Sequence, residues 1–267
     1  HAVDGQDTRR FERYIFPSLD TWFRGSQDTY YVVLGERWKE AYHGKLCNAS
    51  HNFNWSHQYC PRLSPIFVDC PEGYYGESPC CKNEKGMLRM HDVHGKAYDW
   101  FVYMDDDVFI RRKYLAKYVE PLDPSDRAIL ASGKNGGKMS KLGEPSFNYG
   151  KSPYPCSSDL EYMYPWGQPV VYSRGALMRA ATGFRLGGLV KQCLEYGVTH
   201  DVGNAIYHWM MQFPELRIPF PATVNGMELT HFGSHVGKEN DGNFFEIESF
   251  FESKNLTDRA FLRHWHN

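Results

Sequence analysis

The sequence lacks both a long apolar run and an excess of positive charge. No stretch of it approaches the roughly 20 apolar residues that cross a bilayer, and its opening does not have the shape of a signal peptide. The 30 basic residues are balanced by 32 acidic ones, and no long basic block occurs. We therefore expect no nucleic-acid partner. Membrane attachment is expected only through an N-terminal anchor outside this sequence.

Charged residues make up only 23% of the sequence, whereas 42% of the residues are hydrophobic and 16% are aromatic. A chain of 267 residues with this composition can bury a sizeable core. It is therefore predicted to be globular rather than disordered.

Paired Cys-x-x-Cys motifs, which are typical of zinc sites, are missing as well. Five of the seven cysteines lie within residues 47–81, in a loop-like stretch rich in Pro and Gly, which favours disulfides in an oxidising compartment. We predict a Cys47–Cys60 bond and, since seven is odd, a free thiol at Cys193. Glycosylation sequons fit the same compartment and begin at Asn48, Asn54 and Asn255. A lumenal domain of the Golgi or ER, or a secreted protein, is expected.

Short apolar stretches alternate with helical patterns along the chain. Buried strands are predicted in "TYYVVLG", "SPIFVDC", "YDWFVYM", "RAILASG" and "QPVVYS". Helices are predicted in "FERYIFPSLDTWF", "CCKNEKGMLRMHDVHG", "RRKYLAKYVEPL", "RGALMRAAT" and "VTHDVGNAIYHWMMQ". "YDWFVYM" suits a central strand, residues 36–63 an exposed excursion, and residues 132–158 a long loop. This alternation predicts an α/β fold whose sheet is parallel at least in part.

Three consecutive aspartates follow the predicted strand in "WFVYMDDDVFI". Ligands of open α/β sheets bind beyond the carboxyl ends of the strands. Because alternate residues of an extended segment point the same way, Asp105 and Asp107 can converge on one site while Asp106 points elsewhere. A divalent cation that carries a phosphate is the natural ligand of such a pair. The alternative is a solvated acidic turn, partly neutralised by Arg111 and Arg112.

A Cys-Lys pair, Cys81 and Lys82, opens a predicted helix ahead of Trp100, Phe101 and the aspartates. This arrangement resembles the corresponding stretch of Fringe and the core 1 β3-galactosyltransferases, which belong to one family of inverting β1,3-glycosyltransferases. Further similar segments occur between about residues 10 and 240, in the same order along the chain as in the family. They are carried by "LDTWFRGSQDTYYVVLG", "YPWGQPVVYSRGAL", "THDVGNAIYHWM" and "ELTHFGSH".

The resemblance implies a GT-A fold, in which a single Rossmann-like nucleotide-binding sheet continues into an acceptor-binding half. Residues 1–267 would form one catalytic domain, with the UDP-sugar half at about 10–130 and the acceptor half at about 131–250. It also implies Mn²⁺, a donor such as UDP-galactose, UDP-GlcNAc or UDP-glucose, and a glycan or glycoprotein acceptor.

The resemblance also suggests which residues bind the metal and the nucleotide. Asp107 would ligate the metal directly, and Asp105 would approach the ribose or a metal-bound water. His231 and His235 both match versions of the family's metal-binding histidine, and we favour His235. The residues expected at the nucleotide are Asp105, Asp106 and Lys82.

An inverting transfer needs a general base that takes the proton of the acceptor hydroxyl. Asp201 matches the second acid of the family's acidic pair, although a helix N-cap role alone would also account for it. His200 stands in place of the first acid, and "WGQP", which begins at Trp166, stands in place of a glycine-rich turn. His200 and Trp166 are therefore candidates for contact with the acceptor.

Two other functions are compatible with these residues. A metal-dependent phosphodiester or nucleotide hydrolase could use the same carboxylates and histidines, but such enzymes usually hold two metals about 4 Å apart with more acidic ligands. A carbohydrate-binding protein on a degenerate transferase fold would keep the nucleotide site without catalysing transfer.

Overall fold

The computed structural model describes residues 10–47, 59–73, 77–106, 108–110, 112–126, 129–131, 145–146, 150–151, 170–196, 223–224, 227–228 and 233–235. The α-helices are α2 (Phe16–Asp20), α3 (Trp38–Ala41), α5 (Glu77–His94), α6 (Arg112–Val119), α7 (Arg174–Phe184) and α8 (Gly188–Tyr196). Shorter helical turns are η1 (Phe11–Ile15) and η2 (Tyr42–Leu46), both π-helical, and the 3-10 turn η3 (Cys60–Arg62). The strands are β1 (Tyr30–Gly35), β2 (Leu63–Val68), β3 (Trp100–Tyr103), β4 (Val108–Ile110), β5 (Ile129–Ala131), β6 (Pro145–Ser146), β7 (Gly150–Lys151), β8 (Val170–Ser173), β9 (Thr223–Val224), β10 (Met227–Glu228) and β11 (Gly233–His235).

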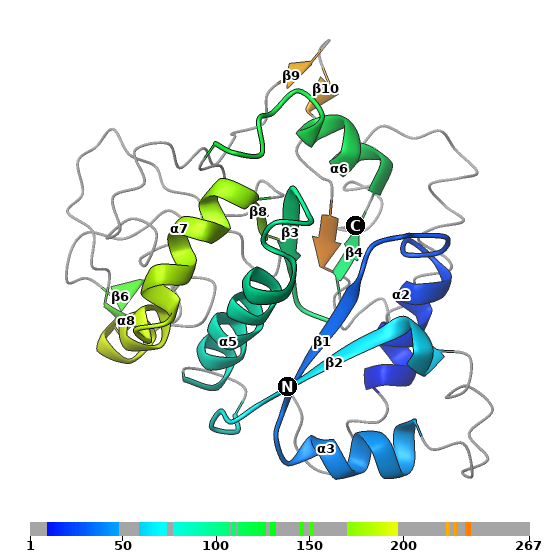
Figure 1. Ribbon diagram of the computed structural model, residues 1–267, viewed down its shortest axis with the longest axis vertical. Helices are drawn as coiled ribbons and strands as arrows, with labels where there is room; N and C mark the ends of the chain where they lie inside the picture. The colour runs from blue at the N-terminus through cyan, green and yellow to red at the C-terminus, as the bar shows by residue number, and fades with distance from the viewer. Residues whose placement is uncertain are drawn as a thin grey trace.

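Strands β1 and β2 form a parallel pair, in register from Tyr30 opposite Leu63 to Gly35 opposite Val68 (Figure 1). Both strands were predicted from the sequence, and their parallel pairing agrees with a sheet that is parallel in part. The preceding turns η1 and α2 share one buried cluster with this pair. Its members include Phe11, Phe16, Leu19, Trp22, Tyr30, Val32 and Leu34.

The predicted exposed excursion over residues 36–63 is wrong for its first part. There α3 and η2 follow each other without a break, and Trp38 and Tyr42 are only 7% and 3% exposed. The two aromatic residues are four positions apart, so they lie on one face of the helical segment and pack into the same cluster as β1.

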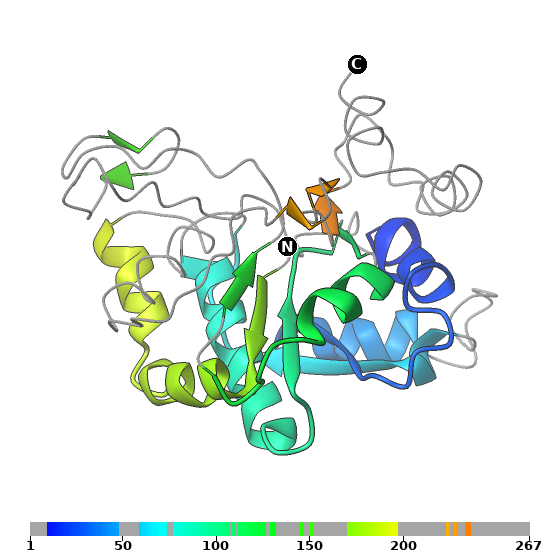
Figure 2. The ribbon, with the colours of Figure 1, turned by 90° about the horizontal axis from the view of Figure 1, so that it is seen from above.

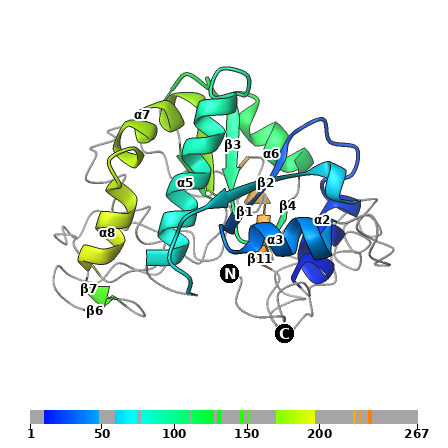
Figure 3. The ribbon, with the colours of Figure 1, turned by 60° about the horizontal axis from the view of Figure 1, so that its bottom comes forward.

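Helix α5, which was predicted from the sequence, lies between the β1–β2 pair and the helices α7 and α8 (Figures 2 and 3). Its middle approaches β1 closely at Gly86, where a Cβ atom would stand 2.7 Å from Cγ2 of Val33. Glycine weakens a helix interior by about 1 kcal/mol relative to alanine. At this position it allows the helix and the strand to pack at short range.

The second sheet is antiparallel and has the order β3, β8, β5. Strand β8 occupies its centre and is buried along its whole length, whereas only Phe101 is fully buried in β3. The prediction of β3 as the central strand is therefore wrong for the described strands. Val170 and Tyr172 of β8 lie in one buried cluster and Val171 lies in another, so this strand is covered on both faces.

The prediction of disulfides is confirmed, and one assignment is corrected. Cys47 and Cys60 are bonded as predicted. Cys193, the predicted free thiol, is instead bonded to Cys80. Both sulfurs lie in the buried cluster between α5 and α8, because Cys193 is on the apolar face that α8 turns toward α5. Cys156 lies outside the described residues.

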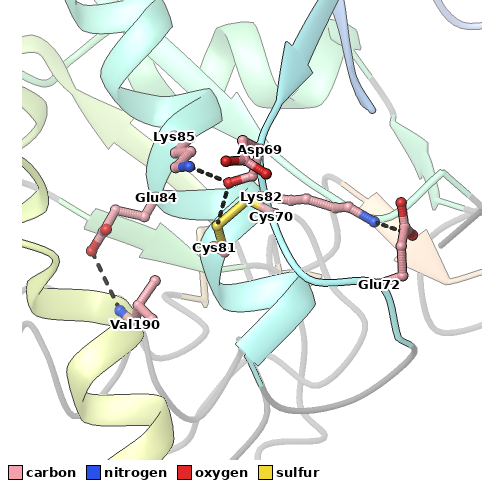
Figure 4. The surroundings of a disulfide bond; sticks show 8 residues. All are labelled: Asp69, Cys70, Glu72, Cys81, Lys82, Glu84, Lys85 and Val190. Carbon is pink, nitrogen blue, oxygen red and sulfur yellow. Dashed lines mark hydrogen bonds and ion pairs between the residues drawn. A yellow bond between two sulfur atoms is a disulfide. The ribbon is translucent and has the colours of Figure 1, made fainter. Parts of the chain in front are cut away.

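The residue next to Cys80 forms the third disulfide, between Cys81 and Cys70 (Figure 4). Three disulfides are typical of proteins that fold in the secretory pathway. In the part of the chain that the structure describes, no helix is long and apolar enough to span a bilayer.

A buried carboxylate joins α5 to α8 one helical turn beyond the Cys80–Cys193 bond. Oε2 of Glu84 accepts hydrogen bonds from the backbone N–H groups of Leu189, at 2.8 Å, and Val190, at 3.3 Å. These groups belong to the first turn of α8 and have no partner within that helix. Burial raises the pKa of Glu84, and the two N–H groups and Lys85 oppose this increase.

Removing a disulfide should destabilise the protein more when the bond closes a longer loop. The cysteines of Cys80–Cys193 are 113 positions apart and those of Cys47–Cys60 are 13 apart. Chain entropy gives about 5 kcal/mol for the long loop and about 3 kcal/mol for the short one. We therefore expect Cys80→Ala/Cys193→Ala to lower the free energy of urea unfolding more than Cys47→Ala/Cys60→Ala. A larger loss from the second pair would show that loop closure does not govern these bonds.

Glu84 should make the stability of the protein fall as pH rises. Its pKa is higher in the folded state than in the unfolded chain, so the folded state binds the proton more tightly between those two values. The stabilisation is complete below the ordinary pKa and is lost as pH rises through the raised one. Glu84→Gln keeps an acceptor oxygen and should flatten this dependence, whereas Glu84→Ala should cost about 1 to 2 kcal/mol near pH 7. Urea unfolding of the three proteins from about pH 4.5 to 8 tests this. An identical pH dependence in wild type and Glu84→Gln would contradict it.

Candidate functional site

The aspartate loop leaves the carboxyl end of β3 and enters β4. Asp105 and Asp106 lie in this loop and are half-buried. Asp107, the expected direct metal ligand, lies outside the described residues, between Asp106 and the first residue of β4. The loop therefore presents carboxylates beyond a strand end, where ligands of α/β sheets bind.

Asp106 forms a two-point ion pair with Arg10. Nε of Arg10 donates to Oδ2 of Asp106 at 2.5 Å, and Nη2 of Arg10 donates to Oδ1. The guanidinium also lies over the ring of Tyr14, 5.2 Å from its centroid. Both carboxylate oxygens of Asp106 thus have a protein partner, which gives this residue a structural interaction in addition to the expected role at the nucleotide.

The arginines after β4 were the alternative partners of the aspartates. Arg112 lies 3.6 Å from the carboxylate of Asp28, in the loop that precedes β1, and over the ring of Phe23. Arg111 lies outside the described residues. A positive charge that does meet the aspartate loop is that of Arg10, which is 96 positions away in sequence.

Strand β4 pairs antiparallel with β11, so a segment near the C-terminus lies beside the aspartate loop (Figure 1). In this register His235 is opposite Val108, the residue that directly follows Asp107. The backbone of His235 and that of the aspartate loop are therefore neighbours, although the sequence separates them widely. His231 lies outside the described residues.

Lys82 lies on α5 and is almost completely buried. Its Nζ is 3.6 Å from Oε2 of Glu72, and Oε1 of Glu72 is 2.8 Å from Nε of Arg37 (Figure 4 shows the Lys82–Glu72 pair). Arg37 follows β1 and Glu72 follows β2, so the three charges gather beyond the carboxyl ends of the parallel pair. The Glu72 carboxylate also occupies the space that a Cβ atom on Gly35 would fill.

The remaining predicted site residues, Trp166, His200 and Asp201, lie outside the described residues. The structure thus places the backbone of His235 beside the loop that holds Asp105 and Asp106. Lys82 lies elsewhere, beyond the ends of β1 and β2. Within the described residues, no group of three or more His, Cys, Asp or Glu side chains is arranged to hold a metal ion. The expected metal ligands also include Asp107. Together the aspartates and the histidine would offer carboxylate oxygens and an imidazole nitrogen, which suit a divalent cation such as Mn²⁺.

Sequence reasoning missed three charged residues of this region. Arg37 and Glu72 lie shortly after the predicted strands "TYYVVLG" and "SPIFVDC", so their positions near strand ends could have identified them. Arg10 carries no such signal, because only the packing of η1 brings it to the aspartate loop.

No protein-family model matches the chain, and a search of curated proteins finds no match. The resemblance to inverting β1,3-glycosyltransferases therefore rests on the sequence motifs, and the family's activity is a proposal for this chain.

Proposed function

We propose that this protein is an inverting glycosyltransferase that moves a sugar from a UDP-sugar to a hydroxyl group of a glycan or glycoprotein. One observation supports this function above the others. The register of β4 and β11 brings His235 beside the aspartate loop, and these are the two segments that the sequence motifs assign to one metal site. A solvated acidic turn gives no reason for a histidine-bearing strand to pair there.

The UDP-sugar half of the chain, at about residues 10–130, would hold Mn²⁺ and the donor beyond the carboxyl ends of its strands. Asp105, Asp107 and His235 supply the ligands for the cation. Bound Mn²⁺ would stabilise the negative charge that develops on the UDP leaving group. Lys82 lies beyond β1 and β2, where the nucleotide-binding half would take the rest of the donor.

The acceptor would be handled by the second half of the chain. Asp201 would accept the proton of the attacking hydroxyl group, on the side of the sugar opposite the leaving group. His200 and Trp166 would contact the acceptor. The proposed fold is the GT-A fold of the family that the motifs resemble. The proposed location is the Golgi or ER lumen or outside the cell, because three disulfides favour an oxidising compartment.

UDP binding should depend on a divalent cation. Without one, Asp105 and Asp107 would repel the diphosphate, whereas a metal ion supplies several kcal/mol of charge stabilisation. Calorimetry should therefore show UDP binding more than about 100-fold tighter in Mn²⁺ than in EDTA. Equal affinity in both conditions would remove the metal from the proposed mechanism.

A screen of UDP-sugars with Mn²⁺ then separates the candidate functions. Slow UDP release from one donor, accelerated by a glycan or glycoprotein acceptor, is expected of the transferase. Rapid release without any acceptor would identify a hydrolase. Tight UDP binding without transfer to any acceptor would identify a degenerate binding protein.

The role of Asp201 can be separated from helix capping by one substitution. Asp201→Asn keeps the size and the capping ability of the residue but cannot accept a proton at neutral pH. Transfer should fall by roughly 10²- to 10⁴-fold while folding and UDP binding survive. Asp107→Asn, measured beside it, should lose metal-dependent UDP binding as well. Near wild-type transfer by Asp201→Asn would refute the assignment and make His200 the next residue to test.

A further inference from the structure

The segment that carries Arg10 is packed against the aspartate loop. Phe11, Tyr14 and Ile15 of η1 lie in the same buried cluster as Val108 and Ile110 of β4. Met104, directly before the aspartates, packs against this cluster. The residues on both sides of the aspartate loop thus pack against the same buried cluster as the turn that follows Arg10.

The turn that follows Arg10 is a π-helix, in which the N–H of Phe16 donates to the carbonyl oxygen of Phe11. Such turns are rare and are found frequently at functional sites. The Arg10 guanidinium is further fixed by the ring of Tyr14. Arg10 is therefore held at its own end of the ion pair as well as by Asp106.

The electrostatic need for this pair follows from three adjacent carboxylates. Like charges at such short range repel one another, and the loop must also stay folded before a cation arrives. The charge of Asp106 also acts on the buried core. Burial raises the pKa of Tyr30 to about 12; the hydrogen bond from Ser18 opposes this increase, and the negative charge of Asp106 adds to it. A planar guanidinium can neutralise one carboxylate through two parallel hydrogen bonds and fix its orientation.

We propose that Arg10 is a positioning residue for the metal site. It neutralises and holds Asp106, and thereby fixes the loop that also carries Asp105 and Asp107. This inference rests on the proposed function, because it takes the aspartate loop as the cation site. Asp106 then acts as the attachment point of the loop.

The experiment measures the affinity for Mn²⁺ alone, from the signal of unbound Mn²⁺ in electron paramagnetic resonance, in the absence of nucleotide. The variants are Arg10→Gln, Asp106→Asn and the double substitution. Loss of partners that orient metal ligands typically weakens metal binding about 10- to 100-fold, and we expect this range for Arg10→Gln. The double variant should be no weaker than Arg10→Gln, because both changes break one interaction.

Arg10→Lys and Arg112→Gln complete the design. Arg10→Lys keeps the charge but loses the two-point geometry, so its Mn²⁺ affinity should lie between those of wild type and Arg10→Gln. Arg112→Gln is the matched control, since it removes an arginine of similar exposure that pairs with Asp28, and it should leave Mn²⁺ affinity unchanged. The midpoint of thermal unfolding is determined for each variant, and Mn²⁺ affinity is measured below that temperature.

Three results would overturn the inference, and they can be told apart. Wild-type Mn²⁺ affinity in Arg10→Gln and Asp106→Asn would refute the positioning role and leave the proposed function intact. Unchanged affinity for Mn²⁺ alone, with weakened UDP binding only in the Arg10 variants, would mean that Arg10 contacts the nucleotide directly. Failure of the unaltered protein to bind Mn²⁺ would end the proposed function and this inference together.

Discussion

Two adjacent cysteines in α5 provide the constraint on which the described structure depends. Cys80 is bonded to α8, and Cys81 is bonded to the segment that follows β2. Consecutive residues are about 100° apart around a helix, so a single turn can be tied to elements on two sides. The polar contacts of that turn repeat the pattern, since Glu84 caps α8 while Lys82 reaches Glu72 after β2. The position of α5 is therefore fixed toward α8 and toward β2. Figure 3 shows the helix between these two elements.

The candidate site combines two groups of paired charges. At the ends of β1 and β2, Glu72 lies between Lys82 and Arg37. At the end of β3, Arg10 balances one carboxylate of a loop that carries three. Partly buried charges of this kind are stable when they are paired and hydrogen-bonded. In the first group one carboxylate meets two cationic side chains, whereas in the second one arginine pairs with a single carboxylate of the loop.

Local patterns predicted the described strands β1, β2, β3, β5 and β8 and the helix α5, because apolar periodicity and β-branched or aromatic content act within a few residues. Long-range features were predicted less well. The burial of Trp38 and Tyr42 depends on a cluster assembled from η1, α2 and β1, and the bond of Cys193 depends on how α8 packs against α5. The choice of His235 at the site came from a motif, and its place opposite Val108 is a property of strand pairing that the sequence does not display. The role of Arg10 could not be predicted, since no motif near it in the sequence indicates contact with the aspartates.

The same constraint on α5 bears on how a transfer reaction would be organised in this chain. Helix α5 leads directly into β3 and the aspartate loop, which would hold the leaving group through the cation. Helix α8 ends at Tyr196, shortly before His200 and Asp201, which would act on the acceptor. An in-line displacement requires the leaving group and the base to be held at a fixed separation, and small errors in such positioning reduce rates strongly. The Cys80–Cys193 bond and the Glu84 cap join these two helices directly. In the proposed reaction they would therefore connect the donor side to the acceptor side by a path much shorter than the intervening chain.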